Sequence, residues 1–309
     1  MRPTEGGVAW RSQKWLSMNS SPPASHFAFG LPVGVSPFSV SMDRNTQQNQ
    51  QSRNWNILNW NIRGLNSEDK CNAIKEKIEE SSCAVFCIQE TKRDHFDHSF
   101  VKKLAPKRFN KFEFSPSVGA SGGILVGWNN SIFTGETIHN NRFAITIKFK
   151  SVHNGQSWLL TTVYGPCQGQ SRDDFVEWLN NLQIDDEENW MILQDFNFYR
   201  SLSNRNRDGG NMNDIMVFNE IISNLGLLEI PLKGRNFTWS NMQSIPLLEQ
   251  IDWVFTSTNW ISTYPNTLML PMARPTSDHI PCKVQIGTSI PKLEVFRFEN
   301  FWIQHPGFF

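Results

Sequence analysis

The chain has 309 residues, and its 29 Lys and Arg balance its 29 Asp and Glu. This length can bury one large α/β core or two smaller ones, and the zero net charge excludes a global basic field of the kind that attracts polyanions. No segment approaches the roughly 20 apolar residues of a membrane span, and five cysteines without metal-type spacing predict reduced thiols and an intracellular protein.

The first 53 residues have the composition of a disordered leader. They contain scattered Gly and Pro and a polar run over 45–54, without a durable hydrophobic period. Residues 11–42 hold no acid and many serines, which weakly resembles an organellar transit peptide, although no amphipathic helix accompanies that composition. We therefore expect a disordered leader over 1–53, with a transit peptide as the alternative, and ordered structure from residue 54.

Three helices are expected after this leader. Each has apolar residues three or four positions apart and a residue that can begin or end a helix. Gly226 is placed to stop the third of them. They are a helix over 68–80 capped by Ser67, a second helix capped by Ser171, and a third over about 213–225.

Two apolar runs illustrate the strands that are expected between the helices. Residues 84–88 are continuously apolar, which predicts a strand buried on both faces. Residues 143–150 alternate between apolar and polar, which predicts a half-exposed antiparallel strand. The mixture predicts an α/β (α+β) fold with two sheets covered by outer helices.

Chemically active side chains recur at or just after the ends of the apolar runs. In α/β sheets ligands bind at the ends of strands, so positions far apart in the sequence can converge on one site. Together the side chains supply carboxylates, amides, a phenol and an imidazole, which metal-assisted phosphate chemistry needs. They are Asn61, Glu90, Tyr164, Asp195, Asn197, Asp252, Asp278 and His279.

The donor types in this set indicate the cofactor. Hard oxygen donors without a Cys or His cluster favour Mg²⁺ or Mn²⁺ over zinc, and Glu90 is the expected first ligand. The nucleophile would be water, and either His279 or Asp195 could activate it. Three arginines that follow Asn197 favour contact with phosphate. They are Arg200, Arg205 and Arg207.

The order of the short motifs resembles a known family. The similarity to the endonuclease/exonuclease/phosphatase superfamily extends over residues 55–286. It implies a four-layer αββα sandwich of two mixed β-sheets flanked by helices, and Mg²⁺-dependent cleavage of phosphodiesters or phosphomonoesters. The motifs are Trp-Asn-Ile-Arg-Gly at 60–64, Ile-Gln-Glu-Thr at 88–91, Ser-Gly-Gly at 121–123, Val-Tyr-Gly-Pro at 163–166, Asp-Phe-Asn at 195–197, Phe-Thr-Trp-Ser at 237–240, Ile-Asp at 251–252 and Ser-Asp-His at 277–279.

The resemblance implies which residues bind the metal and the phosphate. Glu90 would bind the metal with Asn61 alongside it, and Tyr164 would contact the phosphate. Asp278 would complete the site through contacts to the metal or through hydrogen bonds.

The resemblance also implies which residues act on the attacking water. Asp195 and Asn197 would position and activate this water. Asp252 would orient His279, whose imidazole acts as a base or as a donor to the phosphate.

Within the superfamily, the chain resembles the endonuclease domain of plant non-LTR retrotransposons. The likeness rests on Arg63, on the stretch 219–240, and on the tail Phe-Arg-Phe-Glu-Asn-Phe-Trp at 296–302. It implies a double-stranded DNA substrate contacted by Arg63 and Trp239, nuclear action, and neither a membrane nor an obligate protein partner. Residues 54–288 would form the endonuclease-like domain, and residues 289–309 a linker toward an absent reverse transcriptase, as in an orphaned or truncated copy.

Two functions are therefore expected from the sequence. The first is a metal-dependent DNA endonuclease that nicks one strand. The alternative is an inactive remnant, or a nucleic-acid-binding module without turnover. Gln194 motivates the alternative, because the family usually has Gly at this position, where a turn with positive φ would strain any larger residue.

Overall fold

The computed structural model of the chain describes residues 55–119, 121–183, 185 and 187–287. The expected leader over 1–53 and the expected linker over 289–309 lie outside the described residues. Within the described residues, no helix has the length and apolar character needed to cross a membrane.

The first sheet has six strands in the order β13-β14-β1-β2-β4-β3. Its β1 and β2 run parallel, and the other neighbouring pairs are antiparallel. The strands are β1 (Trp55–Asn61), β2 (Val85–Gln89), β3 (Lys111–Val118), β4 (Ser121–Trp128), β13 (Leu268–Pro271) and β14 (Cys282–Ile286).

The second sheet also has six strands, in the order β5-β6-β7-β8-β12-β9. Again a single neighbouring pair, β7 and β8, is parallel, and the others are antiparallel. The strands are β5 (Phe133–Asn140), β6 (Ala144–Ser151), β7 (Ser157–Tyr164), β8 (Trp190–Asp195), β9 (Leu228–Glu229) and β12 (Asp252–Thr256). A separate hairpin is formed by β10 (Trp239–Ser240) and β11 (Leu248–Glu249).

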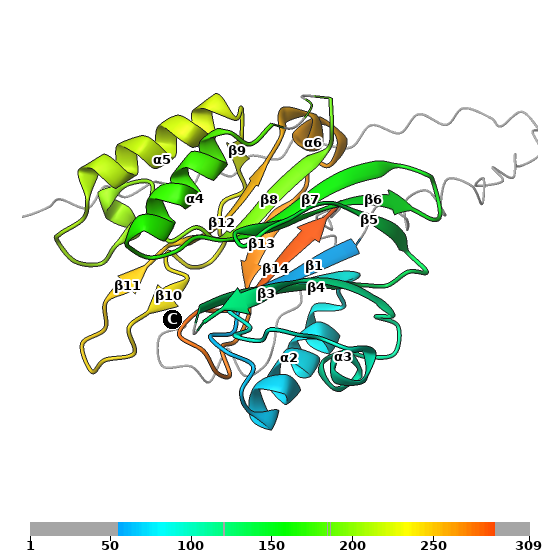
Figure 1. The fold of residues 1–309 in the computed structure, drawn as a ribbon. Helices are drawn as coiled ribbons and strands as arrows, with labels where there is room; N and C mark the ends of the chain where they lie inside the picture. Colours follow the sequence, from blue (N-terminus) through cyan, green and yellow to red (C-terminus); the bar gives the residue numbers. More distant parts are fainter. Residues whose placement is uncertain (1–54, 120, 184, 186, 288–309) are drawn as a thin grey trace, which may run out of the picture. The chain divides into compact units, whose positions relative to one another are not determined.

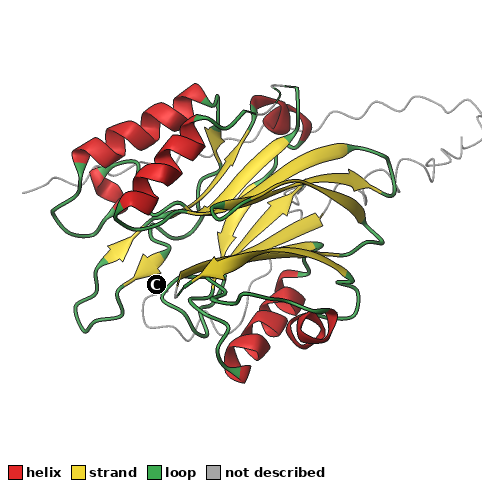
Figure 2. Cartoon of the chain, viewed as in Figure 1, coloured by secondary structure: helices red, strands yellow, loops and turns green. Residues whose placement is uncertain are grey.

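Helices cover the outer faces of both sheets, as Figures 1 and 2 show. On the first sheet lie α2 (Glu68–Ser81) and α3 (His98–Leu104), and on the second lie α4 (Gln170–Asn180) and α5 (Met212–Asn224). Two shorter helices are α6 (Thr258–Thr263) and a 3-10 turn, Leu202–Asn204. This arrangement confirms the predicted four-layer αββα sandwich of two mixed sheets.

The helices α2, α3, α5 and α6 begin at a capping side chain, whereas α4 departs from the prediction. Ser67 accepts a hydrogen bond from the backbone N–H of Lys70 at the start of α2, and Asn211 accepts two at the start of α5. Ser171 lies inside α4, whose first turn follows Gly169 without a capping side chain. The prediction that Ser171 caps this helix was therefore wrong.

Three apolar clusters hold the layers together. One fills the space between the two sheets, one packs α2 and α3 on the first sheet, and one packs α4 and α5 on the second. The central cluster contains a group of large aromatic rings. The ring centres of Trp55 and Trp158 are 4.4 Å apart, and Phe149 stacks on Trp158 with ring centres 4.7 Å apart. Aromatic residues of this chain therefore form much of its core.

The strand β2 is buried along its whole length, as predicted, but β6 is more buried than its alternating sequence indicates. Its polar Thr146 is buried because its hydroxyl is paired with that of Thr161 at 2.9 Å. Thr161 in turn accepts a hydrogen bond from the indole of Trp190. The prediction of a half-exposed strand was wrong because paired threonines can enter a core.

Candidate active site

The strand directions explain why the predicted residues meet at one end of the sandwich. Asn61 ends β1, and Glu90 follows the parallel neighbour β2, so both lie at the same edge of the first sheet. Tyr164 and Asp195 end the parallel strands β7 and β8 and are cross-strand partners in the second sheet. Asp252 begins β12, which is antiparallel to β8, and this places it opposite Asp195.

Asn61 joins the two sheets at this edge. Its Nδ2 donates to Asp195 Oδ2 at 2.9 Å and to Glu90 Oε1 at 3.4 Å. Glu90 Oε1 also accepts a hydrogen bond from the Tyr164 hydroxyl at 3.1 Å. Both carboxylates are buried, so these donors offset part of the cost of removing the charges from water.

His279 is oriented by a carboxylate on the other side of Asp195. Its Nδ1 lies 2.9 Å from Asp252 Oδ2 and 3.2 Å from Oδ1. Its Nε2 lies 3.7 Å from Asp195 Oδ2, which is longer than a hydrogen bond. The imidazole is therefore held through one nitrogen, and the other faces Asp195.

The close packing of acids changes the proton affinity of this cluster. Burial raises the pKa of Asp195 to about 7, against the opposing charge of His279, and Asp252 adds to the increase. Burial alone would lower the pKa of His279, but Asp252 and Asp195 outweigh it and raise this pKa to about 9. Burial and the nearby Glu90 also raise the pKa of Tyr164, so its phenol stays neutral.

The residues present fit a hard divalent cation. Glu90, Asp195 and Asp252 place three buried carboxylates together, and ligand atoms of Asp195, Asp252 and His279 lie within 4.8 Å of one another. Glu90 Oε2 has the Lys92 ammonium 3.7 Å away, beyond hydrogen-bonding distance, so it can accept a further ligand. Oxygen donors and an excess of buried negative charge suit Mg²⁺ or Mn²⁺.

Asp278 belongs to a neighbouring group of side chains. Its carboxylate accepts hydrogen bonds from Arg63 and, at 2.9 Å, from the indole of Trp239. Ser277 ties this loop to the end of β1, since its hydroxyl donates to the carbonyl of Asn61 at 2.8 Å. In this structure Asp278 therefore holds Arg63 and Trp239 at the rim of the cluster.

Positive φ angles are concentrated at the candidate site. At the site, Arg63, Glu90, Lys92, Asn197 and Ser277 have φ between 46° and 68°, and of the other described residues outside glycine Ser82 and Met242 share this range. Gln194 has a φ of 118°, directly before Asp195. Left-handed backbone costs free energy for such residues and is common at functional sites.

Asn197 forms part of the site through its turn. Its backbone N–H donates to Asp195 Oδ1 at 3.1 Å, and its Nδ2 donates to the carbonyl of Gly165 at 2.6 Å. It thus fixes the carboxylate of Asp195 and links the turn after β8 to the turn after β7.

The three arginines predicted to contact phosphate bind other groups of the protein. Arg200 pairs with Glu229 at 2.5 Å on the helix-covered side of the second sheet. Arg205 pairs with Glu249 at 2.7 Å, and Arg207 donates to the carbonyl of Ile245 in the hairpin. The prediction that they bind nucleic acid remains a prediction.

Three further residues of the site were missed in the sequence. Lys92 lies beside Glu90, Ser277 anchors the loop of Asp278, and Arg172 reaches the turns after β7 and β8. Lys92 and Ser277 directly adjoin the recognised motifs, so their position was a usable signal. Arg172 could be noticed only as a cation in the first turn of a helix, where the helix dipole disfavours it.

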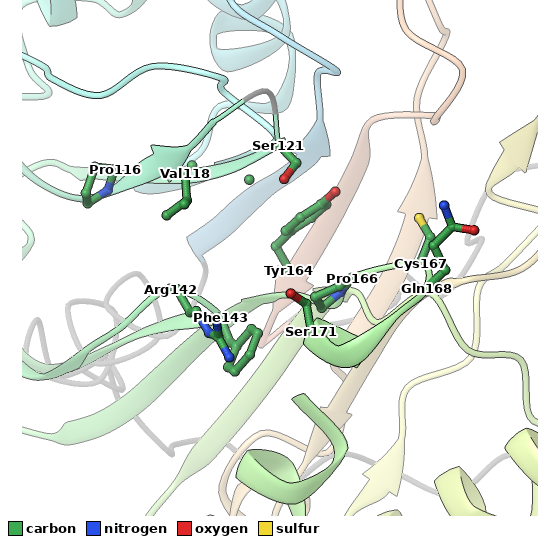
Figure 3. A pocket seen from close by; sticks show the side chains of 12 residues that line it. Pro116, Val118, Ser121, Arg142, Phe143, Tyr164, Pro166, Cys167, Gln168 and Ser171 are labelled. Carbon is green, nitrogen blue, oxygen red and sulfur yellow. The ribbon is translucent and has the colours of Figure 1, made fainter. Parts of the chain in front are cut away.

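A cavity of about 450 Å³ adjoins the cluster at Tyr164. It lies between the β3–β4 turn of one sheet and the segment after β7 of the other. Figure 3 shows the Tyr164 ring between Ser121 on one wall and Pro166 on the other, with Cys167 further along the turn. Of the site residues, Tyr164 lines this cavity, which therefore leaves space for a ligand beside its ring.

Comparison with known proteins agrees with this geometry. The model of the Endonuclease/Exonuclease/phosphatase family matches residues 58–279. A transposon TX1 uncharacterized 149 kDa protein of Xenopus laevis is 26% identical over 166 residues, which are 50% of this chain and 12% of that protein. The chain thus spans about an eighth of the length of this relative.

Solved structures share the fold. The AP endonuclease LMAP of Leishmania major superposes with a TM-score of 0.60 at 16% identity, covering 82% of this chain and 92% of that one. The endonuclease domain of TRAS1, a telomere-specific non-LTR retrotransposon, gives a TM-score of 0.56 at 12% identity, covering 75% and 98%. The catalytic domain of Xenopus laevis APE2 gives 0.54 at 15% identity, covering 75% and 91%.

Proposed function

Because the chain belongs to the endonuclease/exonuclease/phosphatase family, we propose that it is a divalent-metal-dependent phosphodiester hydrolase that nicks double-stranded DNA. The observation that carries the proposal is the convergence of Asn61, Glu90 and Asp195 from separate strand ends into one hydrogen-bonded cluster, with the imidazole of His279 3.7 Å from Asp195. Likeness to a transposon protein and to a retrotransposon endonuclease domain supports DNA as the substrate and a retroelement origin.

Glu90 would hold the cation, with Asp195 close by, and Asn61 would take part through its Oδ1, since its Nδ2 donates to both carboxylates. When bound, the cation would polarise a phosphate oxygen and offset the negative charge that develops on it. Tyr164 keeps Glu90 in place through its hydroxyl, and its raised pKa keeps this hydroxyl a donor.

Asp195 is the group that takes the proton of the attacking water. Both of its oxygens are fixed, one by Asn61 and one by the backbone N–H of Asn197, so the carboxylate has a defined orientation. A positioned carboxylate with a pKa near neutrality suits general base catalysis.

His279 donates a hydrogen bond to the phosphate. Asp252 accepts from Nδ1 and so fixes the ring, while Nε2 lies too far from Asp195 for a hydrogen bond and is left for the substrate. The raised pKa keeps the ring protonated at neutral pH, where its charge offsets that of the transition state.

Nicking of supercoiled plasmid tests this proposal. The purified chain should convert supercoiled to open-circular DNA with Mg²⁺ or Mn²⁺, and a chelator or His279→Ala should abolish the conversion. A thermal melt of each protein establishes that it is folded. Folded wild-type protein that leaves the plasmid intact with both cations would refute the proposal.

A second candidate is a nucleic-acid-binding protein without turnover. Gln194 favours it, because a φ of 118° next to Asp195 is a position where this family usually has glycine. Salt-sensitive DNA binding without cleavage would support this candidate, and cleavage would eliminate it.

A further inference from the structure

Arg172 in α4 contacts two neighbouring turns, an acid of α5 and an aromatic ring. Its Nη1 donates to the backbone carbonyls of Asn197 at 3.0 Å, Pro166 at 3.3 Å and Cys167 at 3.4 Å. Its Nη2 donates to Asp214 at 2.9 Å, and its guanidinium carbon lies 3.6 Å from the centre of the Phe198 ring. The side chain is only 16% exposed, so these contacts are largely shielded from water.

The position of Arg172 in α4 disfavours it electrostatically. It is the third residue of the helix, where the N-terminal end of the helix dipole is positive and a cation costs about 0.3–1 kcal/mol. Gly169 supplies no capping side chain there. The contacts to the neighbouring turns therefore explain why an arginine stands at this position better than helix stability does.

The carbonyls that Arg172 binds belong to the two turns that carry the catalytic groups. Pro166 and Cys167 follow Tyr164, and Asn197 follows Asp195. These turns touch, since a Cβ at Gly165 would lie 2.3 Å from the carbonyl oxygen of Phe196. One guanidinium thus joins both turns while Asp214 anchors it to α5.

The Asn197 carbonyl is a sensitive point of attachment. Asn197 has a φ of 54°, in the left-handed region that asparagine adopts more readily than most residues, and its N–H donates to Asp195 Oδ1. Release of its carbonyl would let the turn relax and would turn the Asp195 carboxylate.

We propose that Arg172 is a positioning residue, which fixes the turns after β7 and β8 so that Asp195 and Tyr164 keep their catalytic orientation. The inference rests on the proposed hydrolase function. It differs from a purely structural role because the carbonyls that Arg172 binds lie in the turns after Tyr164 and Asp195, although its guanidinium also packs on Phe198 of the apolar cluster beneath α4 and α5. Its loss should therefore act on the rate of the chemical step.

The kinetic test compares Arg172→Gln and Arg172→Lys with wild type. Arg172→Gln should lower kcat for Mg²⁺-dependent nicking about 10- to 100-fold and leave KM within about 2-fold, because small misplacements of catalytic groups act on the transition state. Arg172→Lys should recover part of kcat, since an ammonium can reach a carbonyl but lacks the planar fork. An equal change in both variants, or unchanged kcat in folded Arg172→Gln, overturns the proposal.

Two further variants separate positioning from general stability. Asp214→Asn removes the ion pair but leaves the three carbonyl contacts, so its kcat should stay within about 3-fold of wild type. Glu188→Gln removes the ion pair with Lys148, which lies beside the start of β8, at the far end of that strand from Asp195, and should leave kcat and KM unchanged. If Asp214→Asn lowers kcat as much as Arg172→Gln, the ion pair rather than the hydrogen bonds to the three carbonyls determines kcat, and the proposal fails.

Hydrogen exchange gives a readout that needs no activity. In the metal-free protein without DNA, Arg172→Gln, or Arg172→Lys if the former does not fold, should speed exchange of the Asn197 amide and leave β1 and β2 protected. Unchanged exchange at Asn197 overturns the proposal. If the wild type cleaves no DNA, the proposed function fails, and this measurement alone decides the role of Arg172.

Discussion

Gln194 stands where the backbone favours glycine. Its φ of 118° costs a residue with a Cβ about 1–2 kcal/mol. Its side chain is buried, and no described residue bonds its Oε1, which adds the cost of an unsatisfied polar atom. Its cross-strand neighbours Val163 and Trp253 belong to the apolar cluster beneath α4 and α5.

This strain predicts an inverted order of stability for two small substitutions. In an ordinary strand Gly is less stable than Ala by about 0.5–1 kcal/mol, whereas at Gln194 we expect Gln194→Gly to be more stable than Gln194→Ala by about 1 kcal/mol. Both variants lose the same amide and most of the same volume, so their difference reports on the backbone. Urea unfolding measures it, and an alanine variant as stable as the glycine variant would contradict the strain.

The raised pKa values of His279 and Asp195 make the metal-free protein sensitive to base. A group whose pKa is higher in the folded state contributes stability fully below its unfolded pKa and loses it as pH rises through the folded value. The stability that Asp195 contributes is therefore lost between about pH 4 and about pH 7, and that of His279 between about pH 6.5 and about pH 9.

We therefore expect the melting temperature of the protein in chelator to fall between pH 6.5 and 9. Over this range the titration of His279 should lower the free energy of unfolding by on the order of 3 kcal/mol. His279→Gln should show a shallower slope over the same range, because glutamine does not titrate. Equal slopes for the wild type and for His279→Gln would show that His279 is not the titrating group.

At the scale of elements, strand ends could be predicted from the sequence, but the links between turns could not. Short apolar runs mark β1, β2, β7 and β8, and a parallel neighbour brings their final residues to one edge, so Asn61 and Glu90 could be placed together. The pairing of Asp278 with Arg63 and the reach of Arg172 depend on how separate loops meet in space. No local pattern encodes such contacts.

The β10–β11 hairpin carries exposed apolar side chains beside the cluster. Met242 is 60% and Ile245 is 75% exposed, while Trp239 at the base of the hairpin bonds to Asp278. Apolar side chains next to a site that we propose cleaves DNA can insert between base steps. Since exposure means that they contribute little to folding, their presence favours a role in binding DNA.

We expect the double variant Met242→Ser and Ile245→Ser to raise KM for plasmid about 3- to 10-fold, with stability unchanged within about 0.5 kcal/mol. The rate at saturating DNA should stay near that of the wild type. Val152→Ser is the matched control, because Val152 is 54% exposed in the turn after β6, at the end of that strand away from the cluster. An effect of Val152→Ser as large as that of the double variant would argue against a specific role of the hairpin.

At the scale of the whole molecule, the balance of charges restricts how DNA can be bound. The chain carries no net charge, so attraction to phosphate has to come from a local group of cations. Such a group lies beside Glu90, where Arg63, Lys70 and Lys92 come from three separate segments. Burial and the nearby Lys92 lower the pKa of Lys70, which is the expected effect of cations brought close together.

This small cationic group predicts a weak dependence of DNA affinity on salt. About three phosphate contacts give a slope of about −3 in a plot of log affinity against log salt concentration, because each contact releases counterions. Fluorescence anisotropy with the His279→Ala variant and Mg²⁺ measures this slope without cleavage.

Adding Arg63→Gln should reduce the slope by about 1, because the Arg63 side chain is 51% exposed at the rim. Adding Arg200→Gln should leave the slope unchanged, because Arg200 is engaged with Glu229 and Asn219. The opposite result, with Arg200 altering the slope and Arg63 leaving it unchanged, would move the DNA path from the rim of Asp278 to the surface around α5.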